Sequence, residues 1–360
     1  MCDNLFFSLL RTALWDKEES LSLLAEGDVA EILEEAERQT VTALIFDAMT
    51  MYGIKSPIRV MLKYFSYSEV VKQYNRKLNA ASLALGRLLS QNGVDYAIVK
   101  GQVLANLYPK PLLRQPGDID FYCDSNDFER AKRIINQTWR IKFEENYSKK
   151  HLSFVYKGVA FEMHFLLIKF YNKRKNNYWE CLLHNDNGSD VLIDGKPVKT
   201  LSPSLHTLYV FLHLYSHLMN LGIGLRQFCD LAVMLHACQS EIDYEELKQE
   251  LKTLGMEKAF CACGSILVRQ LGLPAEEFPY VLTDKDEHYA NKILNVVFYR
   301  GNLGHYNKKS GIRGWKHNIE SVCIKISHFI KFMPLAPGYS CHWLVYQLFK
   351  KHFETDSSIR

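Results

Sequence analysis

The stretch GVDYAIVKGQVLANLYPKPLLRQPGDIDFYCD, residues 93–124, decides the fold that this sequence predicts. It opens with VDYAIV (94–99), a short apolar run that is typical of a buried strand. KGQVLANLYP (100–109) predicts a turn and a short helix, which Pro109 ends. DIDFYC (118–123) predicts a second strand. Strand, helix and strand in one stretch indicate a small core of mixed α/β structure.

Two aspartates, Asp118 and Asp120, belong to the second predicted strand. Residues i and i+2 of a strand point to the same face, so both carboxylates lie together while Ile119 and Phe121 point into a core. Neighbouring carboxylates repel unless a cation lies between them, and Mg²⁺ prefers carboxylate oxygens. The pair therefore indicates a metal site. The alternative is a strand end with two solvated aspartates.

A third acid, Glu162, lies in VAFEMHFLL (159–167), which otherwise predicts an apolar strand. His164, two residues further on, shares the face of Glu162. Carboxylates on adjacent strands can converge, and two metals that assist a displacement at phosphorus need such a set. We therefore expect Asp118, Asp120 and Glu162 to be the catalytic acids and the ligands of Mg²⁺ or Mn²⁺.

Cationic and flexible residues precede the aspartates. Lys100 and Gly101 lie where a strand passes into a helix, a place at which backbone N–H groups and the helix N-terminus favour anions. Lys100 adds a point charge. Arg114 can contact a phosphate group with two parallel hydrogen bonds. These three residues are the predicted phosphate-binding part of the site.

Helices are predicted on both sides of this core. Residues 1–92 and 201–360 repeat apolar side chains at spacings of three and four, whereas 93–200 contains the strands. The predicted fold class is α+β, a small mixed β-sheet core flanked by N-terminal and C-terminal helical regions. Besides the strands above, strand-like runs are WRIKFEEN (139–146), HLSFVYKG (151–158) and the hairpin VLIDGKPVKTL (191–201) with an Asp194-Gly195 turn.

Three histidines share one face of a predicted helix, because His206, His213 and His217 are spaced by seven and four. His213 and His217 have the spacing of zinc ligands, but the Glu of a metalloprotease motif is absent. They are either packed histidines or cleft residues that contact nucleotide. Arg226 and Asp230 are also four apart, so Arg226 either pairs with Asp230 or binds phosphate.

Composition narrows the class of protein. With 48% hydrophobic and 23% charged residues over 360 positions, the chain is an ordinary globular protein. A net charge of +4 suits an anionic substrate; nucleic acid is possible but not indicated, because no concentrated basic face is visible. Nine scattered cysteines predict free, mostly buried thiols. With no signal peptide or transmembrane segment recognisable, we expect a cytoplasmic protein.

The basic run 308–335 predicts a helix that either packs on the domain or binds a membrane surface or acidic partner.

These motifs resemble the nucleotidyltransferase superfamily of DNA polymerase beta and the kanamycin nucleotidyltransferases, and most closely an uncharacterised family of bacterial nucleotidyltransferases. The matching motifs are VKG (99–101), LYP (107–109), Arg114, DID (118–120), EMH (162–164), HLYSH (213–217) and LRQFCDLAVML (225–235). Two features depart from the wider superfamily, where a Gly-Ser pair replaces Lys100-Gly101 and the third acid is Asp rather than Glu162.

The resemblance implies a nucleoside triphosphate, ATP among the candidates, as substrate, together with a divalent metal. It implies that Asp118 and Asp120 bridge the metal to the triphosphate and that Glu162 helps to deprotonate an acceptor hydroxyl. It also implies that His164, with the helical histidines and Arg226, contacts nucleotide or acceptor. The sequence does not specify the acceptor: a small molecule, a sugar and a protein all fit.

Three functional interpretations follow. The first is transfer of a nucleoside monophosphate from an NTP to an acceptor hydroxyl. The second is a toxin-like transferase that acts on tRNA or protein. The third is a non-catalytic nucleotide-binding or interaction protein on the same fold, which the presence of all three acids disfavours.

Overall fold

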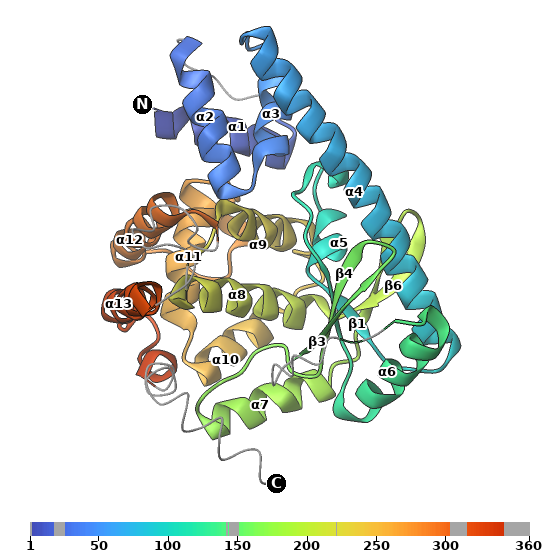
Figure 1. Ribbon diagram of the computed structural model, residues 1–360. Helices are drawn as coiled ribbons and strands as arrows, with labels where there is room; N and C mark the ends of the chain where they lie inside the picture. Colours follow the sequence, from blue (N-terminus) through green and yellow to red (C-terminus); the bar gives the residue numbers. More distant parts are fainter. Residues whose placement is uncertain are drawn as a thin grey trace.

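The computed structural model describes residues 2–17, 26–141, 143, 151–220, 222–302 and 315–341. Three parts are visible in Figure 1: a group of N-terminal helices, a small sheet, and a larger group of C-terminal helices. The N-terminal helices are α1 (Cys2–Trp15), α2 (Glu26–Gln39), α3 (Thr42–Met51) and α4 (Ile58–Gln91). The C-terminal helices are α8 (Pro203–Asn220), α9 (Leu225–Ala237), α10 (Tyr244–Leu254), α11 (Glu257–Arg269), α12 (Asp284–Arg300) and α13 (Trp315–Phe332), with a short 3₁₀ turn η2 (Ala275–Glu277).

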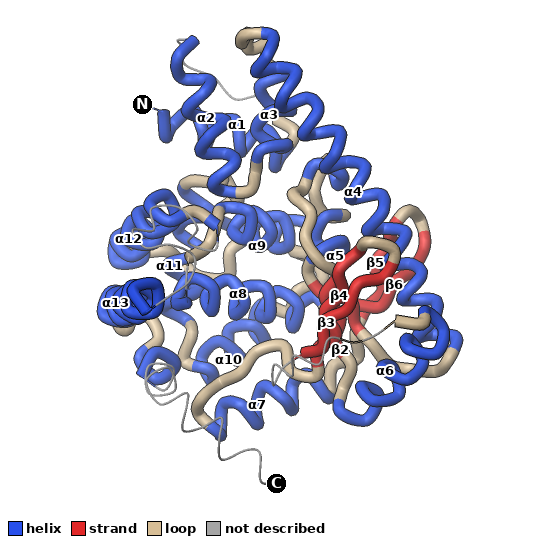
Figure 2. Tube along the Cα trace, in the orientation of Figure 1, coloured by secondary structure: helices blue, strands red, loops and turns tan. Residues whose placement is uncertain are grey.

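The sheet between them is mixed. Its strands follow the order β1-β2-β4-β3, with β1 antiparallel to β2, β2 parallel to β4, and β4 antiparallel to β3. This confirms the predicted α+β class with a small mixed sheet (Figure 2). The strands are β1 (Ala97–Val99), β2 (Ile119–Tyr122), β3 (His151–Tyr156) and β4 (Val159–His164). The intervening helical segments are α5 (Gly101–Ala105), η1 (Pro111–Leu113) and α6 (Ser125–Trp139).

Register gives the two faces of the sheet different chemistry. Ile98, Phe121, Met163 and Leu152 lie side by side on one face, where they pack with apolar side chains of α4 and α6. The opposite face carries the polar residues. On it Val99, Asp120, Glu162 and Ser153 form one row across the sheet, and Ala97, Tyr122, His164 and His151 form the next. Strand alternation thus places every predicted acid on the face away from α4.

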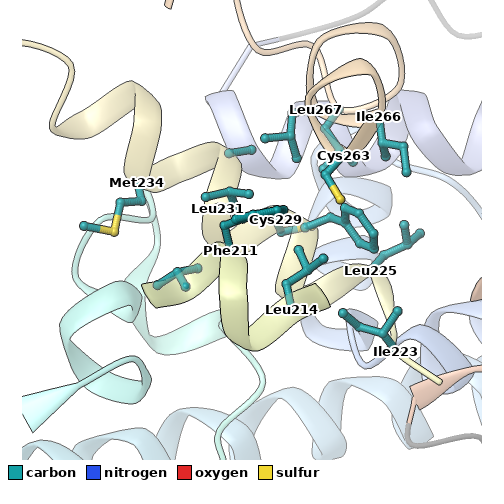
Figure 3. Packing of buried hydrophobic residues seen from close by; sticks show 14 of the residues in the cluster. Phe211, Leu214, Ile223, Leu225, Cys229, Leu231, Met234, Cys263, Ile266 and Leu267 are labelled. Carbon is teal, nitrogen blue, oxygen red and sulfur yellow. The ribbon is translucent and has the colours of Figure 1, made fainter. Parts of the chain in front are cut away.

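One apolar core joins the helical groups. It includes Leu9 of α1, Ile45 of α3 and Val297 of α12 as fully buried side chains. Figure 3 shows its centre, where Phe211 and Leu214 of α8 pack with residues of α9 and α11. Since this core spans the predicted units 1–92 and 201–360, the unit boundaries at 92 and 200 remain predictions.

The segment after β4 differs most from the sequence prediction. A helix that was not predicted, α7 (Lys173–His184), lies between β4 and the hairpin. It begins because Asn172 accepts hydrogen bonds from the backbone N–H groups of Arg174 and Lys175. The hairpin itself is confirmed, with strands β5 (Ser189–Ile193) and β6 (Lys196–Thr200) and left-handed backbone at both turn residues.

The predicted strand 139–146 is not found in its described part. Helix α6 continues to Trp139, and Arg140 ends it in the left-handed conformation. Residues 142 and 144–146 lie outside the described residues. The N-cap of α6 is Asp124, whose carboxylate accepts from two backbone N–H groups, and Ser125 is the first helical residue.

Two further expectations concern exposure. The eight cysteines from Cys123 to Cys341 are free, and three of them are buried, but Cys181, Cys323 and Cys341 are exposed, so fewer thiols are buried than predicted. Within the predicted helix of 308–335, residues 308–314 are not described; α13 packs against α8 and leaves Val322, Ile326 and Ile330 exposed. Among the helices described, none is long and apolar enough to cross a membrane.

Candidate active site

The three predicted acids meet at one edge of a cavity. Asp120 and Glu162 are direct neighbours on the parallel strands β2 and β4, and Asp118 stands immediately before β2. One carboxylate oxygen from each of Asp118, Asp120 and Glu162 lies within 4.8 Å of the others. These carboxylates face a cavity of about 290 Å³, which is bounded on the other side by α8 and α9.

Lys100 holds the centre of this acidic edge. Its backbone has φ 55° and ψ −137°, a conformation that costs a non-glycine residue of order 1–3 kcal/mol. The strained turn directs the side chain back onto β2, where Nζ lies 2.9 Å from Asp120 Oδ2. The same Nζ lies 3.1 Å from His213 Nε2. The backbone N–H of Lys100 donates to His206 Nε2 at 3.1 Å, so this N–H is not open to phosphate as the sequence suggested.

Gly101 follows in the same turn. Its φ is +38°, and a Cβ at this position would meet the backbone oxygen of Asp118 at 3.4 Å. Glycine therefore permits both the turn and the close approach of the chain that precedes β2. Gly101 lines the cavity beside Lys100, as the sequence analysis expected of a residue near phosphate.

His164 contacts the other carboxylate oxygen of Asp120. His164 Nε2 lies 2.7 Å from Asp120 Oδ1 and 3.5 Å from Glu162 Oε2. His151, from the adjacent strand, lies 3.6 Å from Glu162 Oε1. Only the register of β3 against β4 brings His151 close to Glu162.

The pKa values of the three acids are shifted in different directions. Burial would raise the pKa of Asp120, but the charge of Lys100 and the hydrogen bond from His164 outweigh burial and hold that pKa well below its usual range. Burial and the neighbouring Asp120 carboxylate raise the pKa of Asp118. The His164 imidazole lowers the pKa of Glu162 against the effect of burial.

The acidic set fits a hard divalent cation. The three donors are carboxylate oxygens, which Mg²⁺ and Mn²⁺ prefer. Besides burial, the charge of the Asp120 carboxylate raises the pKa of Asp118, and a bound cation would relieve this repulsion. Each oxygen of Asp120 already has one contact, to Lys100 or to His164, and keeps a second lone pair with which it can ligate a metal.

Arg114 differs from its predicted role. Its Nε and Nη2 donate to the two oxygens of Asp230 at 2.6 and 2.7 Å, and Tyr108 donates to the same carboxylate at 2.8 Å. Burial opposes the charge of Asp230, but Arg114 keeps the pKa of Asp230 below its usual value. The guanidinium fork is thus occupied by protein, because Asp230 comes from α9 to meet it.

Arg226 is the more available guanidinium. Its Nη1 donates to the backbone oxygen of Gln115 at 3.1 Å, and Nη1 lies beside Gly117. Nε is buried with no hydrogen-bond partner. In the described part of the chain no ion pair joins Arg226 to a carboxylate, so the predicted alternative of an Arg226–Asp230 pair is not seen. Burial and the nearby Arg114 lower the pKa of Arg226.

The helical histidines lie inside the fold and at its cavity. His213 and His217 line the cavity, with their Nε2 atoms 3.2 Å apart, whereas His206 is fully buried behind Lys100. Burial and the charge of Lys100 lower the pKa of His206 to about 3 and that of His213 far below its usual value. Both imidazoles are therefore neutral hydrogen-bond acceptors for Lys100.

Three polar side chains of the cavity were not proposed from sequence. Asp230 was considered only as a partner of Arg226, and Gln227 and Asn302 were not considered. The spacing of Gln227 after Arg226 carries no signal by itself, and Asn302 comes from the chain beyond α12.

A larger cavity of about 330 Å³ lies at the opposite end of β1 and β2. Three of its four acidic side chains already have partners in the fold. Asp124 caps α6, Asp186 accepts from the backbone N–H of Ser202, and Asp95 pairs with Lys199. These carboxylates are explained by local structure, so the acidic edge at Asp120 is the better candidate.

The chain matches a family of known proteins over most of its length. A model of the family described as uncharacterised nucleotidyltransferase matches residues 25–272, which includes every residue placed in the site above except Asn302. No curated protein sequence matches the chain. A crystal structure of an antigenic nucleotidyltransferase-like protein from Paracoccidioides brasiliensis is similar at 15% identity and a TM-score of 0.35, covering 56% of this chain and 97% of that chain. A score this low says nothing more about the site.

Proposed function

This chain belongs to the uncharacterised nucleotidyltransferase family, and we propose that it transfers a nucleoside monophosphate from a nucleoside triphosphate to an acceptor hydroxyl. One observation carries the proposal. Three carboxylates converge within 4.8 Å at the edge of a cavity whose far wall holds the buried guanidinium of Arg226, which pairs with no carboxylate among the described residues. Such a cavity matches an anionic substrate brought in with a divalent cation.

The acids would divide the work. Asp118, Asp120 and Glu162 would hold Mg²⁺ or Mn²⁺, which when bound neutralises charge on the triphosphate. Glu162 is more open to the cavity than Asp120, with a side chain 30% exposed against 7%. It is therefore placed to accept the proton of the acceptor hydroxyl. The acceptor oxygen bonds to the α-phosphorus, the bond from that phosphorus to the bridging oxygen breaks, and pyrophosphate leaves.

The cations would bind and orient the triphosphate. Arg226 reaches the cavity from α9 and contacts phosphate oxygens there. Arg114 balances the negative charge of Asp230 and so holds this wall of the cavity in place. Lys100 has two partners that exclude one another. Without substrate it pairs with Asp120, and with substrate it moves to phosphate as Asp120 turns to the metal.

The remaining predicted residues would hold the catalytic and binding side chains in position. His213 supports Lys100 from α8, and His217 supports His213. His164 orients Asp120. Gly101 keeps the backbone close to Asp118. The free cysteines fit a reducing compartment such as the bacterial cytoplasm, which is where we place the reaction.

The test is nucleotide binding and transfer by matched variants. The four NTPs are titrated by calorimetry into wild type, Asp118→Ala and Asp120→Ala, with and without Mg²⁺, and transfer of label from each NTP to cell extract is measured. We expect metal-dependent binding in wild type and a loss of transfer of at least about 10³-fold in both variants.

Asp190→Ala is the matched control, because Asp190 is an exposed acid that lines the other cavity. It should leave both readouts unchanged. Transfer that survives in Asp120→Ala would refute the proposal. Metal-dependent binding without transfer to any acceptor would instead favour a nucleotide-binding protein on the same fold.

A further inference from the structure

We propose that His151, Glu162 and His164 form a second metal site, which takes a transition-metal ion of the zinc class rather than Mg²⁺. The site lies on the polar face of the sheet, at the edge formed by β3 and β4. It goes beyond the proposed function and does not depend on it, although Glu162 belongs to both groups.

Register brings the three side chains together. His151 and His164 are directly opposite each other on the antiparallel strands β3 and β4, and their ring centroids are 4.9 Å apart. Glu162 lies two residues before His164 and so shares its face. One ligand atom from each of the three residues lies within 4.8 Å of the other two.

The distances suit ligands of one metal better than hydrogen bonds. The contacts from the histidine nitrogens to Glu162 are 3.6 Å for His151 and 3.5 Å for His164. A good N–H···O bond spans about 2.7–3.2 Å, so both contacts are too long. Two ligands about 2.1 Å from one tetrahedral metal lie roughly 3.4 Å apart. The observed separations need only a small adjustment to meet that value.

The donor set selects the class of ion. Two imidazole nitrogens and one carboxylate oxygen suit Zn²⁺ and its neighbours, whereas the set of Asp118, Asp120 and Glu162 offers oxygen alone. Three protein ligands leave a coordination position open for water or substrate. The two groups thus prefer different metals although they share Glu162.

The site is accessible from one side. The side chains of His151 and Glu162 are 27% and 30% exposed, while that of His164 is only 10% exposed. An ion can therefore enter past His151. On binding, His164 Nε2 exchanges its hydrogen bond to Asp120 for the metal, because one nitrogen cannot serve both. The metal would then hold Glu162 in place and release one oxygen of Asp120.

Metal binding itself is the test, with Zn²⁺ by calorimetry and Co²⁺ by its visible absorption. Wild type should bind one equivalent of either ion in the absence of nucleotide. His151→Ala should bind at least about 100-fold more weakly, since even residues that only support a ligand are worth about 10- to 100-fold in affinity. His151 is partly exposed on an edge strand, so this variant should fold.

Three further variants separate the explanations. His164→Asn should lose the site as His151→Ala does, with its circular dichroism and melting compared with wild type because His164 is buried. Asp118→Ala removes an acid that the second site lacks and should keep Zn²⁺ affinity within about twofold. His184→Ala removes an exposed histidine far along α7 and should change nothing.

The proposal is overturned by any of three results. These are no Zn²⁺ or Co²⁺ binding by wild type, equal binding by His151→Ala and His184→Ala, or a loss in Asp118→Ala as large as that in His151→Ala. No readout uses nucleotide. A protein that binds Zn²⁺ through His151 but transfers no nucleotide would uphold this inference and refute the proposed function.

Discussion

Two buried ion pairs line the same cavity and differ in the number of contacts between their two charged groups. Arg114 and Asp230 meet through two short hydrogen bonds, and Tyr108 takes a further place on the carboxylate. Lys100 and Asp120 meet through one contact, while His213 shares the ammonium group and His164 shares the carboxylate. The side chains of both pairs are at most 15% exposed.

The difference indicates which wall is fixed and which can change partners. A planar guanidinium bound on two nitrogens is held in one orientation, whereas an ammonium group is a point charge that rotates on a flexible stem. The backbone supports this contrast, since Lys100 sits in a strained turn and Arg114 has extended backbone. We therefore assign Arg114–Asp230 to the scaffold and Lys100–Asp120 to the working side of the cavity.

Removing the carboxylate of the fixed pair should have the largest effect on stability. Asp230→Asn leaves the buried Arg114 charge without its partner, which costs about 3–5 kcal/mol of unfolding free energy. Urea unfolding of wild type and variant measures the loss. The control Asp190→Asn, on an exposed acid, should lie within about 0.5 kcal/mol of wild type. Equal stability of Asp230→Asn and wild type would remove the distinction between the two pairs.

The second prediction concerns Arg226 and the affinity for nucleotide. Arg226→Ala deletes the guanidinium that has no carboxylate partner, and nucleotide affinity should fall about 10- to 100-fold, since a charge-assisted hydrogen bond contributes about 1.5–3 kcal/mol. Calorimetric titration with NTP and Mg²⁺ gives the change. Arg174→Ala, on an exposed arginine of α7, is the control. A similar loss in both variants would mean only that net charge matters.

Lys100→Met tests whether the working pair exchanges partners. Lysine competes with metal for Asp120, so Mg²⁺ affinity without nucleotide should rise several-fold in the variant, roughly 1 kcal/mol. Nucleotide affinity should fall, because the phosphate loses a cation. Opposite changes are the expected signature. If both affinities fall together, Lys100 is a fixed part of the wall like Arg114.

The smallest effect concerns His206 behind Lys100. Its folded pKa is about 3 and an unfolded histidine has a pKa of about 6.5, so below pH 6.5 the unfolded chain binds a proton that the folded chain refuses. Stability is therefore lost as pH falls, by about 1 kcal/mol between pH 6.5 and 5.5. In His206→Asn this contribution should vanish and the slope of unfolding free energy with pH should flatten. An unchanged slope would show that His206 is protonated in the fold.

Local patterns predicted the acids well. Asp118 and Asp120 are two apart, so strand alternation puts both on one face, and Glu162 stands out as a charged residue in an apolar strand. The hairpin at Asp194-Gly195 follows from turn chemistry that two residues carry by themselves. In each case the deciding interaction is short in sequence.

Partners distant in sequence could not be predicted. Arg114 and Asp230 are 116 positions apart, and nothing near either residue shows that they meet. His151 reaches Glu162 only through strand register. Helix α7 was missed because KRKNNYWECLLH is mostly polar; a cap at Asn172 and the burial of Trp179 and Leu183 determine it.

The placement of the cavity has a consequence for how such a protein can be rebuilt or recombined. The three acids come from the segment that ends at Thr200, whereas His213, which contacts Lys100, and Arg226, the proposed phosphate-binding residue, come from α8 and α9. A sheet segment transplanted alone into another protein would carry three carboxylates and a lysine with no His213 to steady it. The two segments are therefore expected to be inherited together, and exchange of one without the other should yield a well-formed sheet that does no chemistry.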